Sequence, residues 1–178
     1  MADPDASPSG ARNGSEPIDL LTYIVHTRRT SLVVDAGAPV PDDLVDRLVD
    51  LAIWAPNHKR SWPWRFAVFT GDGRRRLGEA MAAVGEKAGL SHKKVDKMRV
   101  KYLRSPVVVV VSSVADKDPH RRAENRDAVA AAVQNMLLGA TALGLASHWA
   151  SIDDVVAPAV RSVAGTGPAD DLVALVYL

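Results

Sequence analysis

Residues 106–113 read PVVVVVSS, and this stretch decides how the rest of the chain must be arranged. A run of β-branched valines favours an extended strand over a helix. Because successive side chains of a strand point to opposite faces, an unbroken apolar run has to be covered on both sides. We therefore predict a fully buried central strand over residues 106–113, with the other elements arranged around it.

Three further segments have the composition of strands. Residues 64–70 (WRFAVFT) are rich in aromatic and β-branched side chains, and we expect Gly71-Asp72-Gly73 to close this strand. Residues 145–150 form a short apolar stretch, and residues 171–178 (DLVALVYL) form the last one. The central strand therefore has enough partners for a sheet.

Apolar residues at helical spacing predict the remaining elements. The expected helices span residues 17–30, 41–55, 74–87, 91–103 and 123–143, and a further helix begins with Ser151 or Asp153 as its N-cap. Pro41 suits a first helical turn, and Gly144 suits a C-terminal cap. The sequence thus predicts a mixed α and β fold with about four strands and about six helices.

Composition and length limit the classes of protein. The 178 residues suggest one domain over residues 17–178, after a polar, disordered tail over residues 1–16. The net charge of +1 gives no reason to expect nucleic acid or an acidic membrane as the main partner. No cysteine, signal peptide or bilayer-spanning run occurs, so we expect a cytoplasmic protein without disulfides and without a membrane association.

Several familiar catalytic motifs are missing from the sequence. It has no G-x-x-x-x-G-K-[ST] loop, no G-x-G-x-x-G after a strand, no G-x-S-x-G and no H-E-x-x-H. These absences argue against a P-loop nucleotide, a Rossmann-bound dinucleotide, a serine hydrolase elbow and a zinc protease. The five histidines are scattered, so we predict no metal site.

Three segments carry side chains that suit a binding site. Arg28-Arg29-Thr30 offers guanidinium and hydroxyl groups for a phosphate, although a basic helix end would look the same. Residues 54–64 (WAPNHKRSWPW) hold more polar donors than a turn needs, although the tryptophans could simply complete the core. Residues 144–151 (GLASHWAS) run from a strand into a helix N-terminus, where free backbone N–H groups can bind an anion; an ordinary junction is the alternative.

In this order and spacing the segments resemble the FMN-dependent nitroreductase family, and in particular its short, single-domain branch. The family pattern begins with R-R-S, here Arg28-Arg29-Thr30, and continues with a P-x-x-x-L helix, here residues 41–45. Next come A-P-x-H-K-x-x-x-P-W, here residues 55–64, a proline-led apolar strand, here residues 106–111, and Q-N-L-x-L-x-A-x-x-L-G-L-G, here residues 134–146. The resemblance covers residues 18–178.

The resemblance implies an α+β fold, with a central, mostly antiparallel sheet flanked by helices, and a homodimer with FMN at the subunit interface. The phosphate and ribityl end of FMN would be held by Arg28, Arg29 and Thr30. The edge of the ring or ribityl chain would lie along Trp54, His58 and Lys59, while the partner subunit would supply Trp149, Ala150 and Ser151.

The activity implied is hydride transfer from NAD(P)H through FMN to a nitroaromatic or quinone acceptor, by a ping-pong mechanism. We assign no catalytic side chain, because water can supply the protons. The cationic turn around His58 and Lys59 would stabilise the reduced flavin, and the tryptophans would close the core behind it.

The sequence departs from the family pattern at several positions. Thr30 replaces serine and keeps the hydroxyl, whereas Arg60 and Trp62 stand where asparagine and glutamine are usual. These two changes alter the polar recognition of the flavin edge, and Trp62 would narrow the pocket. The sequence ends at Leu178, where relatives continue into an arm that wraps the partner, and the lack of this arm would weaken the dimer or its hold on FMN.

Three other functions compete with this interpretation. A non-enzymatic protein could store FMN, with Trp62 closing the pocket. A specialised relative could act on one substrate, in flavin fragmentation or dehalogenation, with a lid in residues 85–103. Nucleic-acid binding through residues 74–76 and 93–101 is opposed by the net charge, and these stretches have the pattern of solvated helix faces.

Overall fold

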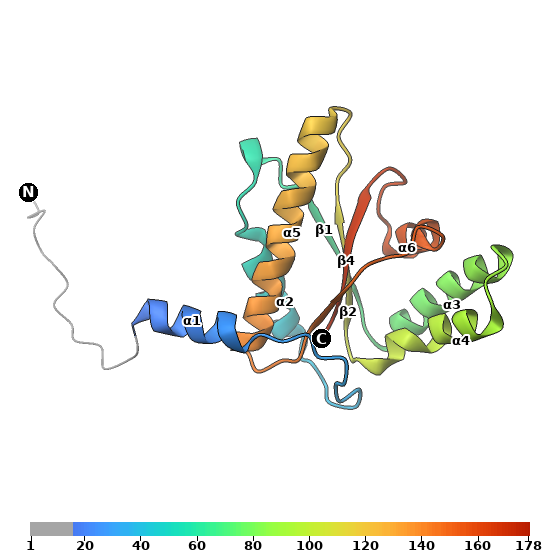
Figure 1. Ribbon diagram of the computed structural model, residues 1–178, viewed down its shortest axis with the longest axis horizontal. Coiled ribbons are helices and arrows are strands. Elements are labelled where there is room, and N and C mark those ends of the chain that lie inside the picture. The colour runs from blue at the N-terminus through green and yellow to red at the C-terminus, as the bar shows by residue number, and fades with distance from the viewer. Residues whose placement is uncertain (1–15) are drawn as a thin grey trace, which may run out of the picture.

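The computed structural model describes residues 16–178, so the expected tail, apart from Glu16, lies outside the described residues. Within that range a sheet is flanked by helices on both faces (Figure 1). The elements in chain order are α1 (Pro17–Thr27), α2 (Asp42–Ile53), the 3₁₀ helix η1 (His58–Arg60), β1 (Trp64–Phe69), α3 (Gly71–Lys87), α4 (His92–Lys101), the 3₁₀ helix η2 (Tyr102–Arg104), β2 (Val108–Ser113), α5 (Pro119–Ala142), β3 (His148–Ala150), α6 (Ala157–Ala164) and β4 (Asp171–Tyr177).

The four strands form one sheet in the order β1-β2-β4-β3, and each neighbouring pair is antiparallel. All six residues of β2 are buried, and Val110 lies opposite Ala67 on one side and Leu175 on the other. The predicted central strand and the α+β class with an antiparallel sheet are both confirmed. An inner position suits the valine run, because both edges and both faces of the strand are covered there.

The alternation of β2 side chains divides the interior into two cores. Val109 and Val111 face the core formed with α2 and α5, whereas Val108 and Val110 face the core on the side of α3 and α6. Figure 1 shows α2 and α5 on one face of the sheet, with α3, α4 and α6 on the other. Helix α5 approaches α2 closely: a Cβ atom at Gly139 would lie 2.6 Å from Leu51 Cδ1.

One expected turn and one expected helix start differ from the structure. Gly71-Asp72-Gly73 does not close β1 in a turn but forms the first turn of α3, with Thr70 as its N-cap. Helix α6 begins at Ala157 rather than after Ser151 or Asp153, because Pro158 in its first turn favours a start there. Residues 154–156 form a separate turn, and Asp153 Oδ1 accepts a 2.9 Å hydrogen bond from Val155 N there.

Helix α1 differs from all the other long helices in having no buried residue. It projects from the body of the molecule and touches it mainly at α5 (Figure 1). Its side chains at Ile18, Leu21 and Val25 are 60%, 50% and 46% exposed, although the three lie on one helical face. The helix ends at Thr27, three residues earlier than expected, and the following residues are extended.

Candidate functional site

The segment Arg28–Thr30 lies beside the strand β3. Thr30 pairs with Ser147 in an isolated parallel bridge, and Ser31 N donates a 3.0 Å hydrogen bond to Ser147 O. The early end of α1 makes this possible, because an extended chain can pair with a strand edge and a helix cannot. Ser147 is buried, and its hydroxyl has no hydrogen-bond partner among residues 16–178.

The two arginines of this segment have different surroundings. Arg29 Nη1 donates to His26 O at 2.6 Å and to Arg28 O at 2.8 Å, so its guanidinium caps the C-terminus of α1. This is the favourable place for a cation next to the helix macrodipole. The side chain of Arg28 makes no ion pair or side-chain hydrogen bond within residues 16–178, and it is half-buried. Arg28 is therefore the arginine that can bind an anion without breaking a contact.

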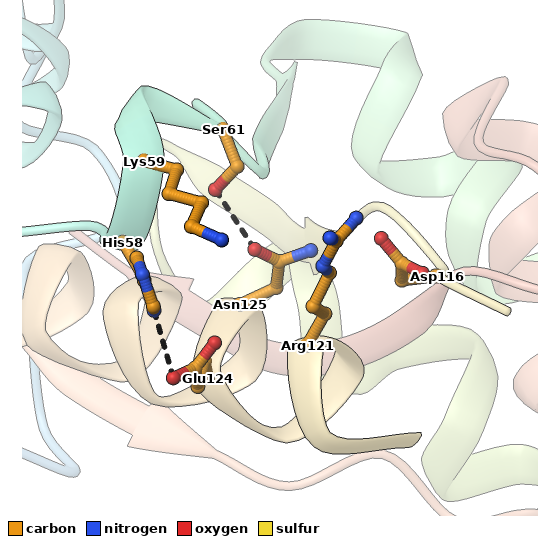
Figure 2. A pocket seen from close by; sticks show the side chains of 7 residues that line it. All are labelled: His58, Lys59, Ser61, Asp116, Arg121, Glu124 and Asn125. Atoms are coloured by element: carbon orange, nitrogen blue, oxygen red, sulfur yellow. Dashed lines mark hydrogen bonds and ion pairs between the residues drawn. The ribbon is translucent and has the colours of Figure 1, made fainter. Parts of the chain in front are cut away.

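The second predicted segment lies against the N-terminal part of α5. His58 Nδ1 is 2.9 Å from Glu124 Oε1, and Ser61 Oγ donates to Asn125 Oδ1 at 2.8 Å (Figure 2). Lys59 points into the same hollow, which has a volume of about 250 Å³. The hydrogen bond from His58 lowers the pKa of Glu124 below its ordinary value.

The backbone of this turn is unusual. Lys59, Arg60 and Trp62 have φ angles of 53°, 54° and 42°, in a region that residues with a side chain rarely adopt. Asn57 Oδ1 accepts a 3.1 Å hydrogen bond from Trp62 N and closes the loop. Positive φ values at non-glycine residues cost free energy and cluster at functional sites. The turn is thus held in one shape by side-chain bonds to α5 and within itself.

The expectation that the tryptophans close the core is correct for only one of them. Trp64 is buried in the core beside α5, but Trp54 and Trp62 are 78% and 59% exposed. Trp54 follows the last residue of α2, and Trp62 lies in the strained turn, so neither side chain can reach the sheet. Both rings are instead exposed on the surface of the chain.

The third predicted segment follows the Thr30–Ser147 bridge along β3. Trp149 is 37% exposed, Ala150 is buried, and Ser151 is exposed at the end of the strand. Trp149 pairs with Val176 of β4, so one side of its strand is held by the sheet. Thr30 therefore contacts the chain two residues before Trp149.

The two groups of candidate residues lie at opposite ends of α5. His58 contacts Glu124 near the start of this helix, whereas Ser147 follows its end at Ala142. Eighteen helical steps of about 1.5 Å separate the two positions by about 27 Å. One chain therefore does not bring His58 and Lys59 to Thr30. Within one chain, the bridge between Thr30 and Ser147 instead links segment 28–30 to the residue just before β3.

Sequence reasoning overlooked Glu124 and Asn125, and it included Ser147 only as a member of the segment 144–151. Glu124 and Asn125 sit in a charged helical turn that has no distinctive pattern, and only the fold brings them to His58 and Ser61. Within residues 16–178, no three His, Asp or Glu side chains are placed to hold a metal ion. No helix in this range is long and apolar enough to cross a membrane.

Comparison with known proteins finds relatives that match most of the chain. The Nitroreductase family, as described by its sequence model, matches residues 27–178. A protein of Escherichia coli K12 named "Putative NAD(P)H nitroreductase YdjA" is 29% identical over 163 residues, or 90% of this chain and 87% of the relative.

Solved structures of nitroreductases also resemble the fold of this chain. The nitroreductase-like family protein from Bacillus cereus has a TM-score of 0.78 at 27% identity, over 88% of this chain and 83% of its own. The FMN-dependent nitroreductase NfnB from Mycobacterium smegmatis, solved in complex with NADPH, has a TM-score of 0.73 over 91% of this chain and 87% of its own. At 16% identity this second likeness concerns the fold alone. Because the family match spans nearly all the described residues, the chain belongs to the nitroreductase family.

Proposed function

We propose that this protein is an FMN-dependent NAD(P)H oxidoreductase, which passes electrons to nitroaromatic or quinone acceptors by a ping-pong mechanism. The observation that carries the proposal is the pairing of Thr30, the last residue of the segment proposed to bind phosphate, with Ser147, which lies two residues before the exposed Trp149. Membership of the family and the names of the relatives support it. The cytoplasm is the proposed location, and cell fractionation tests it.

The residues along this edge fit FMN. The unpaired guanidinium of Arg28 and the hydroxyl of Thr30 suit a phosphate. Ser147 contributes a buried hydroxyl that has no partner within residues 16–178. The exposed part of Trp149 offers apolar surface for a flat ring, and the exposed Ser151 lies at the end of the same strand. Arg29 contributes positive charge while it caps α1.

A second copy of the chain would complete the site. The exposed apolar face of α1 is the kind of surface that a homodimer buries. The separation along α5 means that Trp54, His58 and Lys59 would reach the flavin only from the partner. The proposed assembly is therefore a homodimer with FMN at the interface, in which each site takes segments 28–30 and 149–151 from one subunit.

FMN supplies the hydride-transfer chemistry when it is bound. The chain supplies binding, charge and exclusion of water. Lys59 would place a positive charge near the ring, where it favours the negative charge that develops on reduction. His58 is held by Glu124, and the exposed ring of Trp54 would cover the ligand from the partner's side. No side chain is assigned a proton transfer.

The test is the visible absorbance of the purified protein, recorded before and after NADPH or NADH is added without oxygen. We expect a yellow protein that bleaches and recovers its colour when a quinone or a nitroarene is added. A yellow protein that neither donor bleaches would support storage of FMN and contradict the enzyme. A colourless protein that also rejects added FMN would overturn the proposed cofactor.

A further inference from the structure

The strained turn at residues 57–62 is fastened to helix α5 by its side chains. His58 Nδ1 lies 2.9 Å from Glu124 Oε1, and Ser61 Oγ donates to Asn125 Oδ1 at 2.8 Å (Figure 2). No residue of η1 is buried, so hydrophobic burial does not hold these side chains in place. The two hydrogen bonds to α5 therefore fix where the turn lies.

Glu124 is the partner of two histidines. Its Oε1 is 2.9 Å from His58 Nδ1 and 3.4 Å from Nε2 of His120, which lies one turn earlier in α5. The hydrogen bond from His58 lowers the pKa of Glu124 most, burial opposes it, and the charges of His58, His120 and Lys59 lower it further. Glu124 is therefore an ionised carboxylate at neutral pH, which accepts hydrogen bonds and cannot donate one.

An ionised carboxylate at this position determines which ring nitrogen of His58 carries the proton. Because Glu124 can only accept, the proton of the hydrogen bond belongs to Nδ1 of His58. In the neutral ring the lone pair is then on Nε2, whereas a histidine side chain free in water favours the proton on Nε2. Within residues 16–178 this Nε2 has no partner, and 53% of the His58 side chain is exposed, so its lone pair is open to a ligand.

The contact between His58 and Glu124 acts on the ring more than on stability. Both side chains reach solvent, and water screens the attraction between exposed charges. A histidine on an exposed turn would otherwise sample several rotamers and both neutral tautomers. The hydrogen bond leaves it one tautomer and one direction. The strained backbone at Lys59 and Arg60 further restricts the same turn.

We propose that Glu124 is a positioning residue of the flavin site: it holds His58 with Nδ1 protonated, so that Nε2 accepts a hydrogen bond from the flavin. FMN offers suitable donors in its pyrimidine N–H and its ribityl hydroxyls. The assignment rests on the proposed function, in which His58 reaches the flavin of the neighbouring copy. Glu124 does not touch the flavin itself. Without it, His58 would lose rotamer freedom and its favoured tautomer on binding, and the affinity would fall.

The first experiment uses the flavin-free protein. Nitrogen-15 NMR at about pH 8, above the ordinary histidine pKa of about 6.5, shows which nitrogen of each imidazole carries the proton. The His58 signals are identified by their absence in His58→Met. We expect the proton on Nδ1 in the wild type and mainly on Nε2 in Glu124→Met, or in Glu124→Ala if the first variant does not fold. A wild-type proton on Nε2, or a variant that keeps it on Nδ1, would overturn the proposal.

The second experiment measures the affinity for FMN and for riboflavin by quenching of flavin fluorescence. Glu124→Met and His58→Met should each weaken the binding of both flavins about two- to tenfold, the effect of one hydrogen bond. Removal of a negative charge alone would instead favour the anionic FMN. The control is Asp127→Met, which removes another carboxylate of α5 beside His58 that makes no ion pair or hydrogen bond within residues 16–178. It should bind both flavins at least as tightly as the wild type.

The double variant Glu124→Met/His58→Met tests whether Glu124 acts through the ring. It should bind FMN no more weakly than His58→Met, because a positioning residue has no effect once the residue it positions is gone. A further loss in the double variant, or wild-type affinity in Glu124→Met, would overturn the positioning role and leave the proposed function intact. A wild type that rejects FMN would overturn the proposed function, and the role of Glu124 with it.

Discussion

Strand β2 and helix α1 are both strongly apolar, yet the structure uses them in opposite ways. Every residue of β2 is buried, whereas no residue of α1 is. The strand finds partners on both edges and both faces within its own chain. The helix packs mainly against α5, and its apolar face is left exposed. Hydrophobicity alone would predict burial of both segments, and only the fold shows that α1 stays uncovered within its own chain.

This contrast separates the molecule into a self-sufficient part and an incomplete part. The sheet and the helices α2 to α6 close two cores without help. Helix α1, the segment Arg28–Thr30 and the turn at His58 present unpaired charge or apolar surface. The proposed cofactor and the proposed second copy belong to this incomplete part. Changes in the two parts should consequently have different readouts.

The largest effect is expected from Val110→Asp in β2. A carboxylate would be buried at a position with no exposed surface and no partner, which costs about 4 kcal/mol or more of unfolding free energy. Urea denaturation followed by circular dichroism measures it, and we expect the variant to be largely unfolded without urea. The matched change Ile18→Asp, on the exposed face of α1, should leave the subunit folded. Similar losses in both variants would remove the contrast between the two segments.

The next effect concerns assembly rather than folding. Leu21→Asp should raise the dissociation constant of the proposed dimer about 10- to 100-fold, because a buried leucine contributes about 1.5–3 kcal/mol. Sedimentation over a range of protein concentrations measures this constant. The circular dichroism spectrum should not change, since Leu21 is half exposed in the single chain. A wild type that is monomeric at all concentrations would contradict the proposal that a second copy covers α1.

Arg28→Met should weaken binding of FMN about 10- to 100-fold, the range expected when a charge-assisted hydrogen bond to phosphate is lost. Binding of riboflavin should be nearly unchanged, because it has no phosphate. Arg29→Met is the control, and its effect on the FMN-to-riboflavin ratio should be smaller because Arg29 is held by His26 O and Arg28 O. The reverse order of the two variants would show that Arg29 leaves its cap to bind the phosphate.

Within the self-sufficient part, one added methyl group should lower the unfolding free energy where two helices touch. In Gly78→Ala the new Cβ would lie 2.6 Å from the carbonyl oxygen of Arg99, so α3 and α4 must separate. We expect a loss of about 1–2 kcal/mol in unfolding free energy. In Gly73→Ala, in the same helix, the nearest atom to the new Cβ would be Phe69 Cδ1 at an ordinary contact distance of 3.5 Å, so this change should be neutral or slightly stabilising. Thermal denaturation of the pair measures the difference.

The smallest effect is expected at the turn that holds His58. Because the hydrogen bond with His58 lowers the pKa of Glu124, the pair stabilises the folded state above the unfolded-state pKa of about 4.3. This stability is lost as the pH falls through the lowered folded-state pKa. Glu124→Gln should therefore be slightly less stable than the wild type near pH 7, and the two should converge in acid. A difference that grows in acid would contradict this pairing.

Much of the fold could be predicted from local patterns. The strands at residues 64–70, 106–113 and 171–178 and the helix α5 were expected close to their observed bounds, because their apolar periods agree with their final environment. The misses lie where tertiary contacts override the local pattern. Gly71–Gly73 has the composition of a turn, yet it starts α3. Trp62 has a large, mostly apolar side chain of the kind that is common in cores, yet the strained backbone turns it outward.

The candidate site was less predictable than the fold. The three segments were expected from their side-chain chemistry, and the structure places two of them together through the Thr30–Ser147 bridge. The length of α5 decides which of the three segments lie close together in space. A sequence motif does not reveal this distance. The cations of α4 had the pattern of a solvated face, and only the fold shows that Lys97 and Lys101 line a cavity.

The amino-acid sequence by itself determined the central strand, the α+β class and the residue types able to bind an anionic, flat ligand. Hydrophobic period and side-chain chemistry are local properties, so a single sequence displays them. The tertiary structure alone decided that α1 lacks cover, that His58 is held by Glu124, and that Lys97 and Lys101 line a cavity with His148. These three features depend on contacts between residues far apart in the chain, and such contacts form only when the whole chain folds.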